Sequence, residues 1–181
     1  MDETAIQSCA EFLARARLGG PPTAAPPKHL SPENERDGYE IQETLHETLA
    51  SAGFGRLSGH KIGCTTPVMQ EFLKIDHPCA GRVFSSMEFQ ERIKLPLARF
   101  HHIGVECEIA ARLGVDMPGT IGPYTQESAS DAVSALMGAI ELVDDRYENY
   151  QALSAPVLIA DDFFNAGVVL GRDVPDWRAL D

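Results

Sequence analysis

The sequence of 181 residues has little basic charge, few aromatic residues and no long apolar segment. Only 15 lysines and arginines stand against 27 aspartates and glutamates, which gives a net charge of −12 and leaves no basic cluster. An acidic surface repels phosphate groups and anionic lipid headgroups, so we expect neither a nucleic-acid partner nor a membrane partner. The best candidate for a membrane-spanning segment, residues 133–143, is shorter than a bilayer span and contains Glu141.

Cysteine pairs with metal-binding spacing are also absent from the sequence. The four cysteines are scattered without a CxxC motif, at Cys9, Cys64, Cys79 and Cys107. This pattern excludes a zinc finger and predicts buried thiols in a reducing compartment. The first residues are acidic and lack the apolar segment of a secretory signal, so we expect a cytoplasmic protein.

The residues that are present suit a globular domain, because 44% are apolar and 23% are charged. An apolar stripe at helical spacing predicts an amphipathic helix over residues 3–18. Ser31 followed by Pro32 predicts the start of a second helix, which Gly53 ends.

Beyond residue 57 the pattern changes to short segments separated by Gly and Pro, which is typical of a sheet. Helices are expected at 67–73 and 125–137, and strands at 92–97, 103–113, 139–143 and 166–170. The order of these elements predicts an α+β fold. Its two regions are a helical N-terminal region, residues 1–56, and a mixed β-sheet domain, residues 57–181.

The strand at 103–113 carries the most informative polar pattern. At the strand period of two residues, Glu106 and Glu108 share one face with Gly104 and Ala110. Such neighbours lie about 6.5–7 Å apart, a spacing that suits two carboxylates converging on one ion. The alternative is a solvated strand face, which is the usual origin of alternating polar and apolar residues. The small neighbours Gly104 and Ala110 favour the interpretation that the two carboxylates bind an ion.

Two further residues have unusual surroundings. Glu141 lies inside the apolar segment 139–143, where it must face a cleft or a partner because an unpaired buried charge costs several kcal/mol. Lys61 lies between Gly59 and Gly63, which leave its ammonium group accessible; an ordinary surface lysine is the alternative. Three carboxylates from two strands would form an all-oxygen site that favours Mg²⁺ or Mn²⁺ over Zn²⁺.

Taken together, these segments resemble the fumarylacetoacetate hydrolase superfamily and, within it, the 2-keto-4-pentenoate hydratase branch. The matching segments occur in the same order over nearly the whole chain, at 37–42, 59–65, 81–84, 105–110, 139–146 and 160–171. The resemblance implies a mixed β-sheet roll or barrel of the fumarylacetoacetase C-terminal type. Members of the family continue beyond the segment that resembles 174–181, so we expect a C-terminally truncated sheet with an exposed edge.

The resemblance further implies a Mg²⁺-dependent or Mn²⁺-dependent hydro-lyase of aromatic meta-cleavage catabolism. It would add water to 2-hydroxypenta-2,4-dienoate, the tautomer of 2-oxopent-4-enoate, to give 4-hydroxy-2-oxopentanoate. The metal would be held by Glu106, Glu108 and Glu141. Such an enzyme is expected to be a homo-oligomer, and an assembly with a sister decarboxylase is a further expectation.

The remaining site residues also come from the resemblance. Lys61 and Asp161 are expected to be catalytic, Lys61 by orienting the substrate carboxylate or transferring a proton. Asn165 and Arg146 are expected to bind substrate, although a turn at the start of a strand would also explain Asp161 and Asn165. Asp162 departs from the family pattern, in which Asn is common.

Three alternatives remain open at this point. A sister 2-oxo-3-hexenedioate (4-oxalocrotonate) decarboxylase would need a cation for its second carboxylate, for which Arg82, Arg112 and Arg146 are candidates. Acylpyruvate hydrolysis would need a positioned base and water, and no nucleophilic triad indicates it. A non-catalytic relative could instead bind a partner through the incomplete sheet edge.

Overall fold

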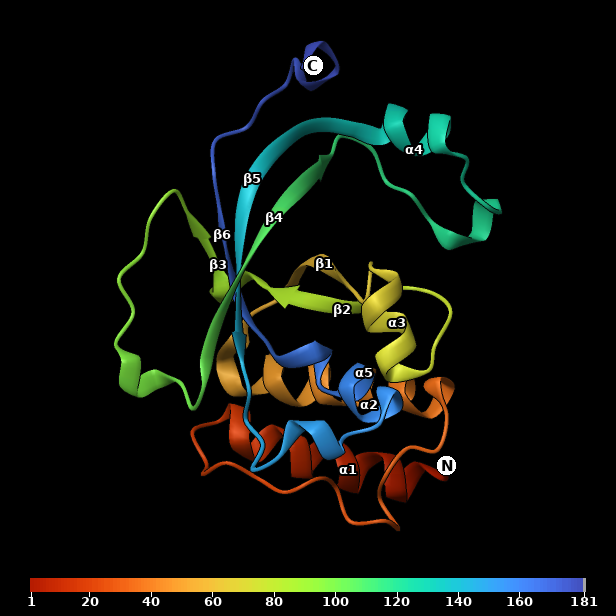
Figure 1. Ribbon diagram of the computed structural model, residues 1–181, viewed down its shortest axis with the longest axis vertical. Helices are drawn as coiled ribbons and strands as arrows, with labels where there is room; N and C mark the ends of the chain where they lie inside the picture. The colour runs from red at the N-terminus through yellow and green to blue at the C-terminus, as the bar shows by residue number, and fades with distance from the viewer. Residues whose placement is uncertain (181) are drawn as a thin grey trace.

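The computed structural model describes residues 1–180, apart from the side chain of residue 121; residue 181, the last of the predicted sheet domain, lies outside the described residues. Most of the helices lie in one half of the molecule and two sheets occupy the other, with one short helix at the far end of the longest strands (Figure 1). The helices are α1 (Glu3–Arg17), α2 (Glu35–Leu49), α3 (Pro67–Leu73), α4 (Gln126–Ala132) and α5 (Ala155–Ala160). This arrangement confirms a mixed helix and sheet fold.

The larger sheet has four strands in the order β3, β6, β5, β4. The long edge strand β4 pairs antiparallel with β5, β5 pairs antiparallel with β6, and β3 pairs parallel with β6. The strands are β3 (Glu88–Gln90), β4 (Ile103–Leu113), β5 (Val133–Asp144) and β6 (Asn165–Leu170). A separate antiparallel pair, β1 (Leu57–Gly63) and β2 (Cys79–Phe84), lies between this sheet and the helices (Figure 1).

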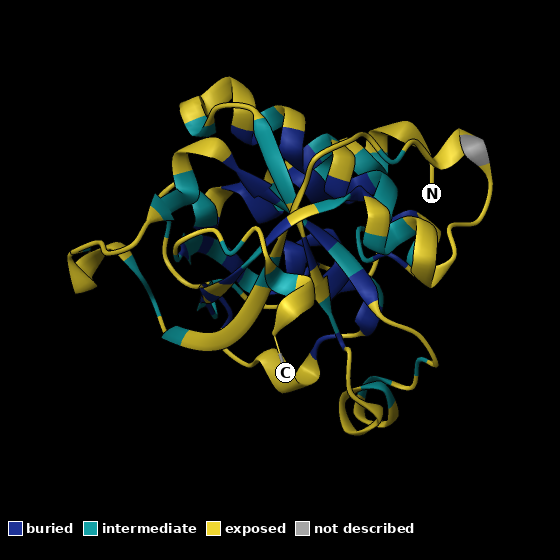
Figure 2. Ribbon diagram, turned by 90° about the horizontal axis from the view of Figure 1, so that it is seen from above, coloured by how far each residue is buried: buried dark blue, intermediate teal, exposed yellow. Residues whose placement is uncertain are grey.

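One apolar core joins the helices to the β1–β2 pair. Helix α2 packs against both α1 and α5, and Leu13, Ile41 and Ile159 from the three helices are almost fully buried. Phe84 at the end of β2 and Phe163 before β6 belong to the same core. Figure 2 shows the buried segments gathered in the middle of the molecule and the exposed ones at its margins. The helical region therefore supports the strands that carry the candidate site.

The start of α2 differs from the prediction. Asn34, not Ser31, is the N-cap residue, and its side-chain oxygen accepts a hydrogen bond from the Asp37 backbone N–H. The Ser31 hydroxyl donates instead to the Pro26 carbonyl oxygen, which holds the preceding turn. Ser31 and Pro32 thus shape a loop, because a capping residue is effective only where the next backbone N–H groups point toward it.

The predicted strand over 92–97 is wrong. The edge strand β3 lies earlier in the sequence and ends at Gln90, because the positive φ of 52° at the next residue, Glu91, turns the chain out of extended geometry. The following residues form a largely exposed segment without a strand partner among the described residues.

The predicted helix over 125–137 is correct only in its first part. Thr125 and Ser128 form a capping box at the start of α4, but the helix ends at Ala132. Val133 already pairs with Leu113 of β4, and burial along β5 then alternates with a period close to two. Pairing with β4 overrides the helical spacing of the apolar residues, because the strand satisfies the backbone and buries every second side chain.

The apolar face predicted for residues 103–113 lies largely in solvent. Val105, Ile109 and Leu113 are 66%, 77% and 52% exposed, and Ile140 of the neighbouring strand is 43% exposed. Cys107 on this face is exposed as well, which corrects the prediction that all four thiols are buried. None of the described helices is long and apolar enough to cross a membrane.

Candidate metal and substrate site

The pairing of β4 with β5 brings three carboxylates together. Glu106 lies directly opposite Glu141 in the register, and Glu108 lies opposite Ala139. One carboxylate oxygen from each glutamate lies within 4.8 Å of the other two. The predicted convergence of Glu106, Glu108 and Glu141 is therefore present, and like charges placed opposite one another on a sheet are unfavourable unless a cation lies between them.

Lys61 and Asn165 complete this arrangement. Lys61 Nζ lies 2.8 Å from Glu141 Oε1, and both side chains are almost fully buried. The Asn165 amide donates a 2.9 Å hydrogen bond to the same oxygen, while Lys61 Nζ also donates to the Phe163 carbonyl oxygen at 3.4 Å. We call these five residues the carboxylate cluster: Lys61, Glu106, Glu108, Glu141 and Asn165.

The carboxylate cluster fits a divalent cation. Its three carboxylates face a single ammonium group, and Glu141 Oε2 is buried without a hydrogen-bond partner. Burial and the negative charge of Glu141 raise the pKa of Glu108, and Glu106 adds to this effect while Lys61 opposes it. Mg²⁺ or Mn²⁺ would balance the excess negative charge and give the unpartnered Glu141 oxygen a ligand bond, and both ions prefer an all-oxygen donor set.

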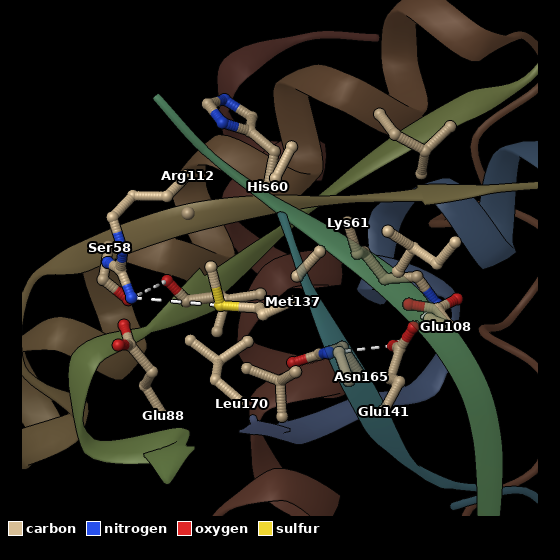
Figure 3. Close-up of a pocket in the computed structure, with 18 of the residues that line it drawn as sticks. Ser58, His60, Lys61, Glu88, Glu108, Arg112, Met137, Glu141, Asn165 and Leu170 are labelled. Carbon is tan, nitrogen blue, oxygen red and sulfur yellow. Dashed lines mark hydrogen bonds and ion pairs between the residues drawn. The ribbon is translucent and has the colours of Figure 1, made fainter. Parts of the chain in front are cut away.

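The cluster lies at one end of an open cavity of about 930 Å³. In Figure 3, Glu108, Glu141, Lys61 and Asn165 gather at that end, and the apolar side chains of Met137 and Leu170 lie between them and the opposite end. A concave, partly apolar space with a few converging polar groups is the usual form of a small-molecule site.

The opposite end of the cavity is also polar. Arg112 from β4 and Glu88 from β3 lie there beside Ser58 of β1 (Figure 3). Arg82 and His60 also line the cavity and are hydrogen-bonded to each other. Burial and the neighbouring Arg82 charge lower the pKa of His60. Of the three arginines considered as partners for a second substrate carboxylate, Arg82 and Arg112 reach the cavity and Arg146 does not.

Asp161 and Arg146, two of the predicted site residues, do not line the cavity. Asp161 is 2% exposed and pairs with Arg17 at 2.8 Å and with Arg146 at 3.1 Å. Asp162 next to it is fully buried and accepts hydrogen bonds from Arg17 and His46. We call this group the ion-pair network: Arg17, His46, Arg146, Asp161 and Asp162. Asp161 is therefore paired inside the protein, whereas Arg146 also has a buried Nε without a hydrogen-bond partner. The catalytic role of Asp161 and the substrate-binding role of Arg146 stay predictions.

The network also shapes the turn that precedes β6. Asp162, Phe163 and Phe164 have φ values of 50°, 47° and 65°, a left-handed conformation that residues with side chains rarely adopt. This turn places the Phe163 carbonyl oxygen beside Lys61 and directs Asn165 to Glu141. No glycine marks the turn in the sequence, so the sequence analysis missed it; the only signal was the departure from the family pattern at Asp162.

Comparison with known proteins places the chain in a family, although no protein-family model matches it. It is 32% identical over 181 residues to a 2-keto-4-pentenoate hydratase of Burkholderia vietnamiensis, which covers 99% of this chain and 67% of the relative. It is 33% identical over 176 residues to a hydratase of the same name from Paraburkholderia xenovorans, with 97% and 64% covered. A 4-oxalocrotonate decarboxylase of a Pseudomonas species is 32% identical over 136 residues, with 75% and 51% covered.

The fold agrees with these relatives. A solved structure of 4-oxalocrotonate decarboxylase from Pseudomonas putida, complexed with magnesium and adipate, superposes with a TM-score of 0.84 at 18% identity, covering 99% of this chain and 67% of that one. The fold is thus that of the decarboxylase. The chain belongs to the family of 2-keto-4-pentenoate hydratases and 4-oxalocrotonate decarboxylases, and it spans about two thirds of the length of the hydratases described above.

Proposed function

We propose that this protein is a metal-dependent hydratase that adds water to 2-hydroxypenta-2,4-dienoate and forms 4-hydroxy-2-oxopentanoate. The observation that carries the proposal is the carboxylate cluster, with its uncompensated negative charge at one end of a cavity of ligand size. The hydratases at 32–33% identity support the choice of reaction.

The proposed metal ligands are Glu106, Glu108 and Glu141, with Mg²⁺ or Mn²⁺ as the ion. A divalent cation at these oxygens supplies charge stabilisation to the oxygens of a 2-oxo acid during proton transfer. The magnesium complex of the decarboxylase structure supports the presence of such an ion.

We assign two tasks to Lys61. Its ammonium group, held by Glu141 Oε1 and the Phe163 carbonyl oxygen, lies where it can bind the substrate carboxylate or pass a proton. Asn165 fixes Glu141 through the amide hydrogen bond and thereby keeps one oxygen of that carboxylate turned toward Lys61. Met137 and Leu170 provide apolar surface for the hydrocarbon part of the substrate.

Decarboxylation of 2-oxo-3-hexenedioate is the second candidate function. It is favoured by the presence of Arg82 in the cavity lining, since that substrate carries a second carboxylate, and by the decarboxylase relative. Both reactions would use the same carboxylate cluster, so they differ in what the rest of the cavity must hold.

Product analysis separates the two functions. The 181-residue chain is incubated with Mn²⁺ and either 2-hydroxypenta-2,4-dienoate or 2-oxo-3-hexenedioate, and products are followed by NMR. We expect 4-hydroxy-2-oxopentanoate from the first substrate and no CO₂ release from the second. CO₂ release without hydration would replace the hydratase by the decarboxylase, and the absence of both products would contradict an enzymatic role for this chain.

A variant pair ties the activity to the site. Lys61→Met should reduce hydration about 100-fold, since a positioned acid or base contributes on that order, and should retain Mn²⁺ binding because the three carboxylates remain. Lys94→Met removes an exposed lysine far from the cavity lining and serves as the matched control. Equal activity of the two variants would show that Lys61 takes no part in the reaction.

A further inference from the structure

The two polar ends of the cavity differ in how their charges are balanced. At the carboxylate cluster, negative charge is in excess of the single Lys61 ammonium group. At the far end, the Arg112 guanidinium lies beside Met137 and near Glu88 and Ser58 (Figure 3). An unpaired arginine at the opposite end of the cavity from a metal-binding end would be a receptor for the second carboxylate of a dicarboxylic acid.

Arg112, however, is already occupied by a carboxylate of the protein. Its Nε donates to Asp173 Oδ2 at 2.8 Å and its Nη2 donates to Asp173 Oδ1 at 3.1 Å, which is a bidentate pair. Asp173 comes from the segment that follows β6, and this segment is anchored to β5 by two backbone hydrogen bonds between Leu136 and Val174. The pair is therefore held in place by the backbone on both sides.

Glu88 adds to the negative surroundings of this arginine. The hydrogen bond from Asp173 and the charges of Asp173 and Glu88 raise the pKa of Arg112, against the opposing effect of burial. One guanidinium thus faces two carboxylates, so a further anion arriving at this end would meet net negative charge. Arg82 is held against His60, on the β1–β2 pair.

We propose that Asp173 is a specificity-determining residue, which occupies Arg112 and restricts the cavity to 2-oxo acids with an uncharged tail. The inference rests on the proposed function, because it takes the carboxylate cluster to bind the 2-oxo acid end. It assigns hydratase-type substrates to this chain through one residue that lies outside the cavity lining. Removal of the Asp173 charge should free Arg112 and open the cavity to dicarboxylic 2-oxo acids.

The proposal is tested by ligand binding to the Mn²⁺-loaded 181-residue chain, measured by isothermal titration calorimetry. Two probes have equal chain length and differ only in their tail, 2-oxoadipate with a terminal carboxylate and 2-oxohexanoate with a terminal methyl group. Oxalate, which reaches only the metal end, is the reference ligand. The measured quantity is the ratio of the two dissociation constants, compared between variants at one salt concentration.

We expect the unaltered protein to bind 2-oxohexanoate at least as tightly as 2-oxoadipate. Asp173→Asn should shift the ratio at least fivefold toward 2-oxoadipate, and adding Arg112→Gln should reverse that shift. Asp176→Asn removes a neighbouring exposed charge from the same segment and should leave the ratio unchanged. Oxalate affinity should be the same in all four proteins.

The outcomes separate this inference from the proposed function. A shift smaller than fivefold in Asp173→Asn with oxalate binding intact overturns the role of Asp173 alone. A preference of the unaltered protein for 2-oxoadipate also overturns it, and loss of that preference in Arg82→Gln would identify Arg82 as the receptor. Failure of every protein to bind oxalate overturns the 2-oxo acid site and the inference with it.

Discussion

The carboxylate cluster and the ion-pair network contain the same kinds of charged groups but differ in how completely their carboxylates are paired. In the network, Asp161 is paired with Arg17 and Arg146, and Asp162 accepts hydrogen bonds from Arg17, His46 and the Arg82 backbone N–H. In the cluster, three carboxylates share one lysine and an oxygen of Glu141 has no partner.

The difference distinguishes a structural polar group from a functional one. A buried carboxylate that is fully paired keeps its charge and rigidifies the fold. A group of carboxylates with too few partners is costly unless a ligand completes it. The two groups are adjacent, because the turn from Asp162 to Asn165 belongs to the network at one end and to the cluster at the other.

Asp162→Asn is expected to produce the largest effect. Removal of this buried charge leaves Arg17 and His46 without one of their partners, so the free energy of unfolding should fall by about 3–5 kcal/mol. Urea denaturation followed by circular dichroism measures the change. Asp131→Asn, which breaks an exposed pair with Arg178, is the control and should cost about 1 kcal/mol or less. Equal effects of the two variants would show that the network contributes no more than a surface ion pair.

Glu106→Gln should weaken metal binding by the carboxylate cluster and leave the stability of the fold nearly unchanged. Glu106 is exposed and has no hydrogen-bond partner among the described residues, so the free energy of unfolding of the metal-free protein should be nearly unchanged. Mn²⁺ affinity should fall about 100-fold, because one of three charged oxygen ligands is lost. Electron paramagnetic resonance of free Mn²⁺ measures the affinity.

Glu71→Gln is the matched control for this variant, since it removes an exposed glutamate of α3 far from the cluster. It should bind Mn²⁺ as tightly as the unaltered protein. Unchanged Mn²⁺ affinity in Glu106→Gln would remove Glu106 from the ligand set. A large loss of stability in the same variant would contradict the conclusion that the ion-pair network, and not the carboxylate cluster, stabilises the fold.

The smallest expected effect is a difference in pH dependence between the two groups. The pKa of Glu108 is raised by burial and by Glu141, so protons compete with the metal as pH falls toward that pKa. Mn²⁺ affinity should therefore decrease as pH falls from neutral toward that pKa.

The network should respond at lower pH. Burial alone would raise the pKa of Asp162, but Arg17 and His46 bring it below the ordinary value of 3.8. A depressed folded-state pKa contributes stability above the unfolded-state value, and this stability is lost as pH falls through the folded-state value. We therefore expect the contribution of Asp162 to be retained at pH 5 and lost below about pH 3.8. Constant Mn²⁺ affinity, or loss of the Asp162 contribution near pH 5, would contradict the assignment.

The sequence predicted much of the carboxylate cluster and less of the ion-pair network and strand pairing that hold it in place. The strand Ile103–Leu113 has the predicted bounds, and its period of two correctly places Glu106 and Glu108 on one face. Glu141 was identified because a carboxylate in an apolar strand requires a special environment. The prediction failed for residues 133–137, where helical spacing and strand alternation coexist and only pairing with β4 decides between them.

Asp161 and Arg146 show a second limit of sequence reasoning. Both are charged residues in segments that resemble the family, and nothing in their order along the chain reveals that Asp161 pairs with both Arg146 and Arg17. Arg17 is 144 residues away from Asp161. The ion pairs of a buried charged side chain cannot be predicted from its sequence neighbours when its partners are this distant.

The sequence by itself determined the acidic character of the chain and the strand pattern of the two glutamates. These properties depend on composition and on neighbours within a few residues. Only the tertiary structure decided which carboxylates are neutralised and which retain excess charge, because that depends on contacts between segments far apart in the chain. The same applies to Arg112, whose partner Asp173 reaches it only because the segment after β6 folds back beside β5.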